Sequence, residues 1–199
     1  MRILSRRAAL AATIGGLFAG AARAQPLPER VRGRIAGLEG DLLRITTREG
    51  AEARVRLGEA PVSALRRVAL GELAPGTNLG VVALAEADGL RAIAVTVLPA
   101  TATRQFQSPW DLGPDSSMNN GAVAGVMQGA QASELTLSIN GRAVPMRVDD
   151  RTAIVQPIPA RREDLKVGAA VFVFGTRGAD GVVAATRVTV EKDGVAPPT

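Results

Sequence analysis

Apolar and polar residues alternate with a period of two through two stretches of the chain, residues 31–98 and 122–191. Because successive side chains of a strand point to opposite faces, this alternation predicts half-buried β-strands. The alternation is interrupted once in each stretch, at Pro61–Gly76 and at Ile158–Gly168. We predict a short helix or an ordered loop at both interruptions, followed by a turn into the next strand.

The clearest predicted element is a hairpin at Leu135–Val148. Its centre is Asn140-Gly141, a pair favoured in type I′ turns because both central residues need a positive φ. A two-residue turn pairs Leu137 with Val144 and places both side chains on one face. The hairpin therefore predicts a strand pair with one buried face.

The two stretches also repeat each other at an offset of 92 residues. The matched segments are Val31–Ile35 with Val123–Met127, Leu73–Gly76 with Leu165–Gly168, and the turn Asp88-Gly89 with Asp180-Gly181. Several matches in one register predict a duplicated unit. About five short strands in roughly 70 residues cannot bury an open two-sided sheet, whereas a small closed barrel has no edges.

The predicted fold class is therefore all-β: two tandem small OB-like β-barrels joined by an ordered linker and preceded by a signal peptide. The predicted boundaries are 1–24 for the signal peptide, 25–30 for an N-terminal lead, 31–99 for the first barrel, 100–121 for the linker with Trp110, 122–191 for the second barrel and 192–199 for a flexible tail. Each barrel is expected to consist of one copy of the unit.

The first copy carries a sequence pattern of turn and core positions: V-x-G-x-I, L-x-P-G, a V-x-V strand and D-G-x-x-A-x-x-V. The residues in these motifs are Val31, Gly33, Ile35, Leu73, Pro75, Gly76, Val81, Asp88, Gly89, Ala92 and Val95. This pattern resembles a family of exported bacterial domains of unknown function, which are small barrels similar to the OB-fold. The second copy has Val167 in place of Pro75. The resemblance implies a fold and gives no catalytic residue.

Residues 1–24 have the features of a signal peptide: arginines near the N-terminus, a weakly apolar Ala8–Ala22 segment and the cleavage motif Ala22-Arg23-Ala24. Ser5–Leu10 resembles a twin-arginine motif, and Sec export is the alternative. Cleavage removes four arginines and no acid, so the formal charge falls from +5 to +1 (5 − 4). We predict a periplasmic or secreted product with no membrane span after cleavage and no nucleic-acid partner, because nucleic-acid binding needs surplus cations.

The chain has no histidine, cysteine or tyrosine. It therefore has no Ser-His-Asp or Cys-His nucleophile system and no zinc or haem site of the usual ligands, and we expect no cofactor. The leading hypothesis is a non-enzymatic binding or envelope-assembly protein whose partner is an envelope protein, a peptide or a glycan. The alternatives are a carboxylate-dependent glycan hydrolase and a divalent-metal-responsive accessory protein that uses the linker acids.

The linker holds most of the candidate site residues, which are Phe106, Trp110, Asp111, Asp115 and Asn119. One interpretation makes the two aspartates ligands of a hard cation such as calcium. Another places the indole at the junction between the barrels, with the first aspartate capping a turn. A small ligand or a peptide is the third possibility.

Phe172 and Phe174 are the remaining candidates. Their spacing places both on one face of a strand, opposite Val171 and Val173. If the valines face a barrel core, the phenylalanines face outward. They then pack against Trp110 or Phe106, or form an apolar patch for a partner.

Overall fold

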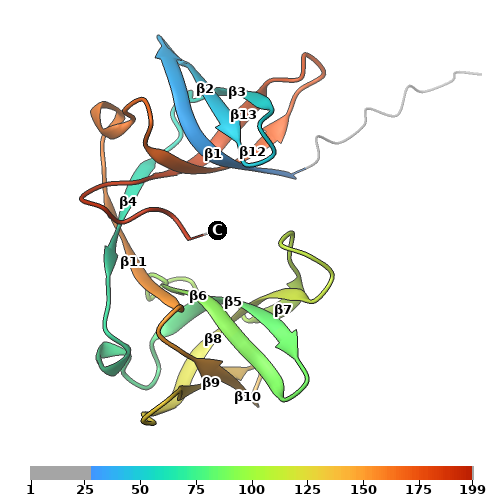
Figure 1. Cartoon of the computed structure of the whole chain (residues 1–199), viewed down its shortest axis with the longest axis vertical. Coiled ribbons are helices and arrows are strands. Elements are labelled where there is room, and N and C mark those ends of the chain that lie inside the picture. The colour runs from blue at the N-terminus through green and yellow to red at the C-terminus, as the bar shows by residue number, and fades with distance from the viewer. Residues whose placement is uncertain (1–27, 199) are drawn as a thin grey trace, which may run out of the picture.

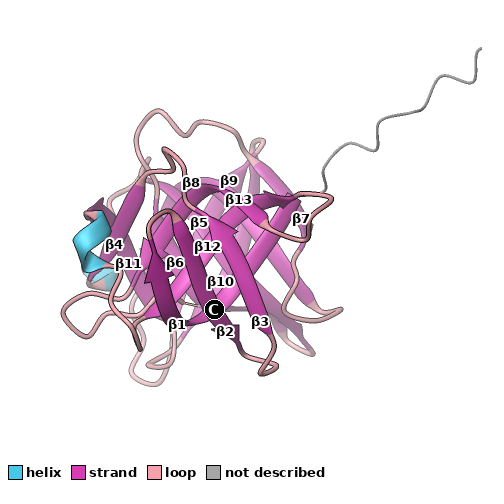
Figure 2. Ribbon diagram, turned by 90° about the horizontal axis from the view of Figure 1, so that it is seen from above, coloured by secondary structure: helices cyan, strands magenta, loops and turns pink. Residues whose placement is uncertain are grey.

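The computed structural model describes residues 28–198, which form an all-β fold (Figure 1 and Figure 2). The strands are β1 (Pro28–Glu39), β2 (Leu42–Thr47), β3 (Glu52–Arg56), β4 (Val62–Arg67), β5 (Asn78–Glu86), β6 (Gly89–Val97), β7 (Phe106–Pro109), β8 (Ser116–Met127), β9 (Ser133–Ile139), β10 (Arg142–Val148), β11 (Ala153–Pro159), β12 (Ala170–Arg177) and β13 (Val183–Val190). Two short 3-10 helices, Leu70–Glu72 and Arg162–Asp164, follow β4 and β11. The predicted signal peptide lies outside the described residues.

Strands β1, β2, β3, β13 and β12 form a closed five-stranded barrel, called here the first ring. Its neighbouring strands pair antiparallel, except that a short parallel pairing of Val183 with Val55 joins β13 to β3 and closes the ring. Leu43, Ile45 and Val173 are completely buried inside it. Closure leaves few unpaired edges, and alternate aliphatic side chains fill the interior.

Strands β5, β6, β10, β9 and β8 close in the same way and are called the second ring. A short parallel pairing of Met146 with Leu90 joins β10 to β6. Leu79, Leu135 and Leu137 are completely buried in a separate core. The described residues therefore contain two apolar interiors, one in each ring.

The strand pairing contradicts the expectation of one barrel for each copy. The first ring combines β1–β3 from the first copy with β12 and β13 from the second, whereas the second ring combines β5 and β6 with β8–β10. Strands β4 and β11 cross between the rings and pair antiparallel, with Leu65 opposite Pro157 (Figure 1). The boundaries 31–99 and 122–191 thus do not coincide with the rings.

Strand β4 lies within Pro61–Gly76, where the sequence predicted a helix or a loop, and β11 extends into the second such stretch, Ile158–Gly168, with its last two residues. The short 3-10 helices do occur there, but β4 and β11 precede them. Strands β4 and β11 lie between the two rings and not with one face against a single core. Their buried residues therefore need not alternate with exposed ones. In β4, for example, Ala64 and Leu65 are adjacent and both are buried.

The register of the first strand also differs from the prediction. Ile35 pairs with Ile45 just before a bulge in β1, and Val123 pairs with Leu137 just before a bulge in β8. These positions correspond at an offset of 88 (123 − 35), not 92. Met127, which the sequence matched with Ile35, is 66% exposed.

With the corrected register, Gly33 of β1 corresponds to Gly121 of β8. A Cβ at Gly33 would lie 2.1 Å from the carbonyl oxygen of Thr46, and one at Gly121 would lie 2.6 Å from that of Ser138. Both distances are too short for any side chain. Glycine therefore permits the close approach of neighbouring strands where each ring curves.

The predicted hairpin turn at Asn140-Gly141 is confirmed. Asn140 and Gly141 have φ values of 50° and 78°, as a type I′ turn requires. Val144 pairs with Leu137, and both are buried. The β12–β13 connection contains the predicted Asp180-Gly181. The β5–β6 hairpin turns one residue earlier than predicted, at Ala87-Asp88, and Gly89 already pairs with Glu86.

The segment predicted to be a flexible tail turns back into the molecule. Asp193 and Gly194 have positive φ values of 51° and 74°, and Val195 donates a hydrogen bond to the carbonyl of Lys192 (2.9 Å). Pro197 is buried, and Figure 1 shows the C-terminal end of the chain between the two rings. No helix in residues 28–198 is long and apolar enough to cross a membrane.

The exchange of strands predicts how separated halves behave. Residues 25–100 alone lack two strands of the first ring and three of the second. We expect this half to be unfolded when monomeric, or to form dimers in which one copy completes the rings of another. Sedimentation and far-UV circular dichroism would show this, and adding residues 101–199 should restore the fold. A folded monomeric half would contradict the exchange.

Candidate functional site

A cleft of about 570 Å³ lies between the outer faces of the two rings. Strands β4 and β11 bridge the rings on one side, and the loop after β7 rises from the second ring towards the first on another (Figure 1). Four candidate residues from the sequence line this cleft: Phe106, Trp110, Phe172 and Phe174. The fold thus gathers every aromatic side chain of the described residues at one place.

Phe172 and Phe174 form the wall contributed by β12. Their ring centroids are 4.5 Å apart, with an angle of 44° between the ring planes. Val171 and Val173 point into the first ring and are 2% and 0% exposed. The predicted outward orientation of the two phenylalanines is therefore confirmed.

Arginines from the neighbouring strands lie over these aromatic rings. In the sheet register, Phe174 lies between Arg30 of β1 and Arg187 of β13, whereas Phe172 pairs with Arg32. The Arg187 guanidinium is 4.2 Å from the Phe174 centroid, and that of Arg32 is 4.3 Å from the Phe172 centroid. Such stacking is favourable because the ring face is electronegative.

The opposite wall, contributed by β5, has small side chains. Gly80 and Val82 line the cleft, at the positions that the sequence matched with Phe172 and Phe174. A Cβ at Gly80 would meet the Asn120 side-chain oxygen at 3.2 Å. The wall contributed by β12 is therefore aromatic and cationic, whereas the wall contributed by β5 has small, uncharged side chains.

The loop at residues 110–115, called here the strap, holds Trp110 at the cleft. Its two ends are joined by a hydrogen bond from the Trp110 amide to the Ser116 carbonyl (2.9 Å). The Ser116 hydroxyl lies 2.7 Å from the carbonyl oxygen of Gly113 and accepts a hydrogen bond from the Leu112 amide (3.2 Å). Ser116 is itself buried, so these contacts organise the strap from inside.

Asp111 connects the strap to the first ring. Its carboxylate accepts two hydrogen bonds from Arg32 of β1, at 2.6 and 2.9 Å, and lies 3.8 Å from Arg30. The Arg30 guanidinium also lies 3.9 Å from the Trp110 ring centroid. Bidentate contacts of this kind specify geometry as well as charge.

The same pairing controls the ionisation of Asp111. Partial burial raises the pKa of the carboxyl group, but the hydrogen bonds from Arg32 and the charges of Arg32 and Arg30 outweigh burial, so the pKa lies below its ordinary value. The carboxylate is therefore ionised at neutral pH and already paired. This pairing disfavours the interpretation of Asp111 as a metal ligand.

The other candidate residues lie away from the cleft lining. Asp115 is exposed on the strap. Asn119 is fully buried in the second ring, where it donates to the Val81 carbonyl (3.2 Å) and accepts from Gln107 (2.7 Å), a structural role. In residues 28–198 no group of three acidic side chains is placed to hold a metal ion.

Several polar groups at the cleft have no partner within the described part of the chain. The Trp110 indole nitrogen and the Arg32 Nε are buried without a hydrogen bond. No ion pair or hydrogen bond engages the guanidinium of Arg187, which is an exposed residue whose pKa is nevertheless lowered by partial desolvation. Since no aspartate or glutamate of residues 28–198 lines the cleft, it offers donors and positive charge next to aromatic surface.

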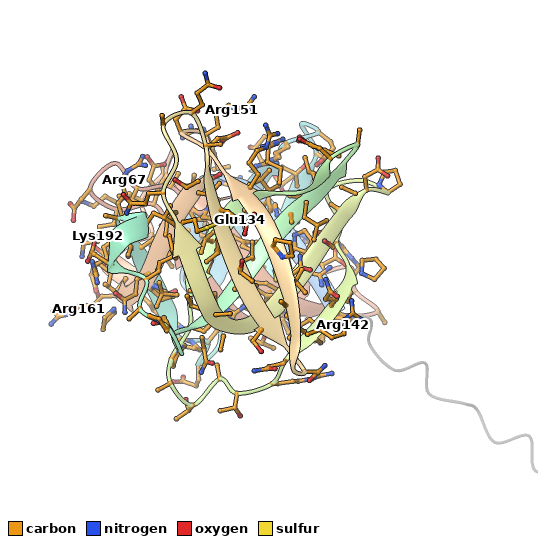
Figure 3. All side chains as sticks on the ribbon, turned by 90° about the horizontal axis from the view of Figure 1, so that it is seen from below. Arg67, Glu134, Arg142, Arg151, Arg161 and Lys192 are labelled. Carbon is orange, nitrogen blue, oxygen red and sulfur yellow. The ribbon has the colours of Figure 1, made fainter. Side chains whose placement is uncertain are left out.

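The charged residues elsewhere are dispersed. Figure 3 shows Arg67, Glu134, Arg142, Arg151, Arg161 and Lys192 at separate places around the molecule. A second, smaller hollow of about 340 Å³ includes Arg162, but this side chain already pairs with Asp41 (3.1 Å). The aromatic cleft is therefore the better candidate site.

The fold and the site define an all-β protein with a closed five-stranded barrel and a cationic aromatic cleft on the outer faces of its sheets. Comparison of the chain with protein-family models, with curated proteins and with solved structures gives no match. The functional argument therefore depends on the cleft itself.

Sequence reasoning missed Arg30, Arg187, Pro197 and Pro198, which also line the cleft. A signal for the arginines exists, because Arg30-x-Arg32 and Phe172-x-Phe174 have the same two-residue spacing. Only the pairing of β1 with β12 brings these residues together. The sequence gives no comparable signal for the prolines.

The paired state of Asp111 predicts a pH-dependent stability. Because its folded-state pKa is depressed, the stabilisation is complete above about pH 4 and is lost as the pH falls through the folded-state pKa. Asp111→Asn should lower the free energy of unfolding at pH 7 by about 0.5–1 kcal/mol, with no difference from wild type in acid. Urea unfolding at both pH values measures this. Asp115→Asn is the control, and a difference that persists in acid would contradict the assignment.

Trp110→Ala should loosen the connection between the rings. The residue is only partly buried, so we expect a loss of about 1–3 kcal/mol, below the cost of truncating a fully buried aromatic residue. Thermal melting measures the loss, and faster cleavage by endoproteinase Asp-N at Asp111 and Asp115 reports on the strap. Val167→Ala, at a 71% exposed position, is the control. Unchanged melting and cleavage would count against this role of the indole.

Proposed function

We propose that this chain is an exported, non-enzymatic binding or envelope-assembly protein and that it binds its partner in the cleft between the rings. The observation that supports the proposal most directly is the wall formed by Phe172, Phe174, Arg30 and Arg187. Aromatic surface next to unpaired donors is the composition of a ligand site. The signal-like residues 1–24 support a periplasmic or secreted location.

The two alternatives, a glycan hydrolase and a metal-responsive accessory protein, have less support. A glycan hydrolase needs two carboxyl groups facing each other at roughly 5–9.5 Å, and the described cleft lining contains no carboxylate. Asp149 pairs with Arg151 at 3.0 Å and is not part of the cleft lining. A cation site in the strap would have to displace Arg32 from Asp111.

The proposal also includes the origin of the fold. The two halves are copies of one unit, related to the OB-like exported domains that the first copy resembles, with strands exchanged between the copies. Matching bulges in β1 and β8 and the glycines Gly33 and Gly121 support a common unit. Duplication then explains why one cleft forms between two outer faces.

Affinity capture from a periplasmic extract of the source bacterium tests the function. The mature wild-type protein should retain at least one envelope component that Phe174→Ala and Arg187→Gln both lose. The aromatic substitution removes the stacking surface, and the arginine substitution removes the charge. Both variants should keep the wild-type circular dichroism spectrum because neither side chain belongs to a ring core.

Two results would overturn the function. One is an identical set of retained components for wild type and both cleft variants. The other is a specific turnover by the purified protein that a point mutation abolishes. Val167→Ala serves as the matched surface control for the capture.

A further inference from the structure

We propose that the cleft is a groove for extended, proline-containing peptides and that the protein's own segment Ala196–Pro198 occupies it as an internal ligand. This inference rests on the proposed function and specifies its ligand. Pro197 and Pro198 lie among the residues that line the cleft, together with Trp110 and Phe174. Figure 1 shows this end of the chain between the rings.

The path into the cleft is held by specific contacts at the end of β13. Glu191 donates its amide to the Ala170 carbonyl (2.8 Å), and its carboxylate accepts from the Ala170 amide (2.9 Å). The Lys192 ammonium group lies 3.1 Å from Asp164. The tight turn at Asp193 and Gly194 then reverses the chain. These contacts anchor the turn from which the two prolines extend into the cleft.

The chemistry of a Pro-Pro segment suits this cleft. Proline lacks an N–H group and has a fixed φ, so the pair is extended, loses little entropy on binding and presents carbonyl oxygens as acceptors only. The cleft offers aromatic faces and, as a donor, the exposed guanidinium of Arg187. Among residues 28–198, no aspartate or glutamate lines the cleft. A proline, which has no backbone N–H to donate, therefore leaves no carboxylate of the lining without a partner. Proline-rich peptides bind aromatic-lined grooves on other folds for the same physical reasons.

The size and shape of the cleft agree with a peptide chain as occupant. Gly80 and Val82 on the facing wall leave room beside the phenylalanines, and Pro197 is buried there while Pro198 is half-buried. About 570 Å³ of cleft is still open with the prolines in place. An external proline-containing segment of a partner protein would compete with the internal one for the part of the aromatic wall that Pro197 and Pro198 cover.

The test uses mature protein that ends at Val195 and the synthetic peptide Gly-Val-Ala-Pro-Pro-Thr, which copies residues 194–199. Trp110 is the only tryptophan of the chain, so its fluorescence reports directly on the cleft. The shortened protein should bind the peptide with a saturable change in emission. The full mature chain should bind about tenfold or more weakly, because its binding-competent fraction is reduced by the internal segment.

Matched controls separate proline recognition from simple opening of the cleft. A peptide with both prolines replaced by alanine should bind the shortened protein at least about tenfold more weakly, since it loses rigidity and ring contacts. In the full chain, Pro197→Ala combined with Pro198→Ala should raise affinity for the original peptide towards that of the shortened protein. Circular dichroism and thermal melting verify that each protein is folded.

The inference is overturned if the folded shortened protein does not bind the peptide, or if the alanine peptide binds equally well. Loss of peptide binding on Phe174→Ala would support the aromatic wall as the contact surface. The outcome is independent of the capture experiment. A partner captured through the cleft without peptide binding would remove the proline-peptide inference and keep the binding function, whereas no capture and no peptide binding would remove both.

Discussion

Strands β4 and β11 cross between the two rings, and the arrangement of the rings depends on their antiparallel pairing. Each crossing strand carries its chain from one ring to the other, so that neither ring can close with strands of one half alone. The pair also continues the hydrogen-bonded sheet, because β4 pairs with β13 and β11 pairs with β6. The distance between the rings is thereby set by backbone hydrogen bonds, and a cleft is left between their outer faces.

The strand β12 shows how one short sequence serves both stability and binding. Its valines fill the first ring, and its phenylalanines form the aromatic wall of the cleft. Because successive side chains of a strand point to opposite faces, the valines can fill the core while the phenylalanines line the cleft. Neighbouring strands then add arginines beside the phenylalanines, where stacking offsets part of the cost of placing charge near apolar surface.

The strap adds a polar connection to this arrangement. Ser116 organises it from within the second ring, and Asp111 reaches the arginines of the first. The single indole is therefore positioned by two rings at once. Its nitrogen is buried without a partner inside the described residues, so the donor that the cleft presents is the guanidinium of Arg187.

The sequence by itself determined most of the ring strands, the turn at Asn140-Gly141 and the outward orientation of Phe172 and Phe174, because these follow from local period-two patterns and from turn residues that need positive φ. It also identified the four aromatic residues that meet in the cleft. Tertiary structure decided which half completes each ring and the four-residue shift of β8, since an aliphatic core accepts any strand with the same period-two pattern of apolar residues. The arginine wall and the buried Pro197 likewise required the fold, because cross-strand neighbours and a returning chain end are contacts between residues far apart in sequence.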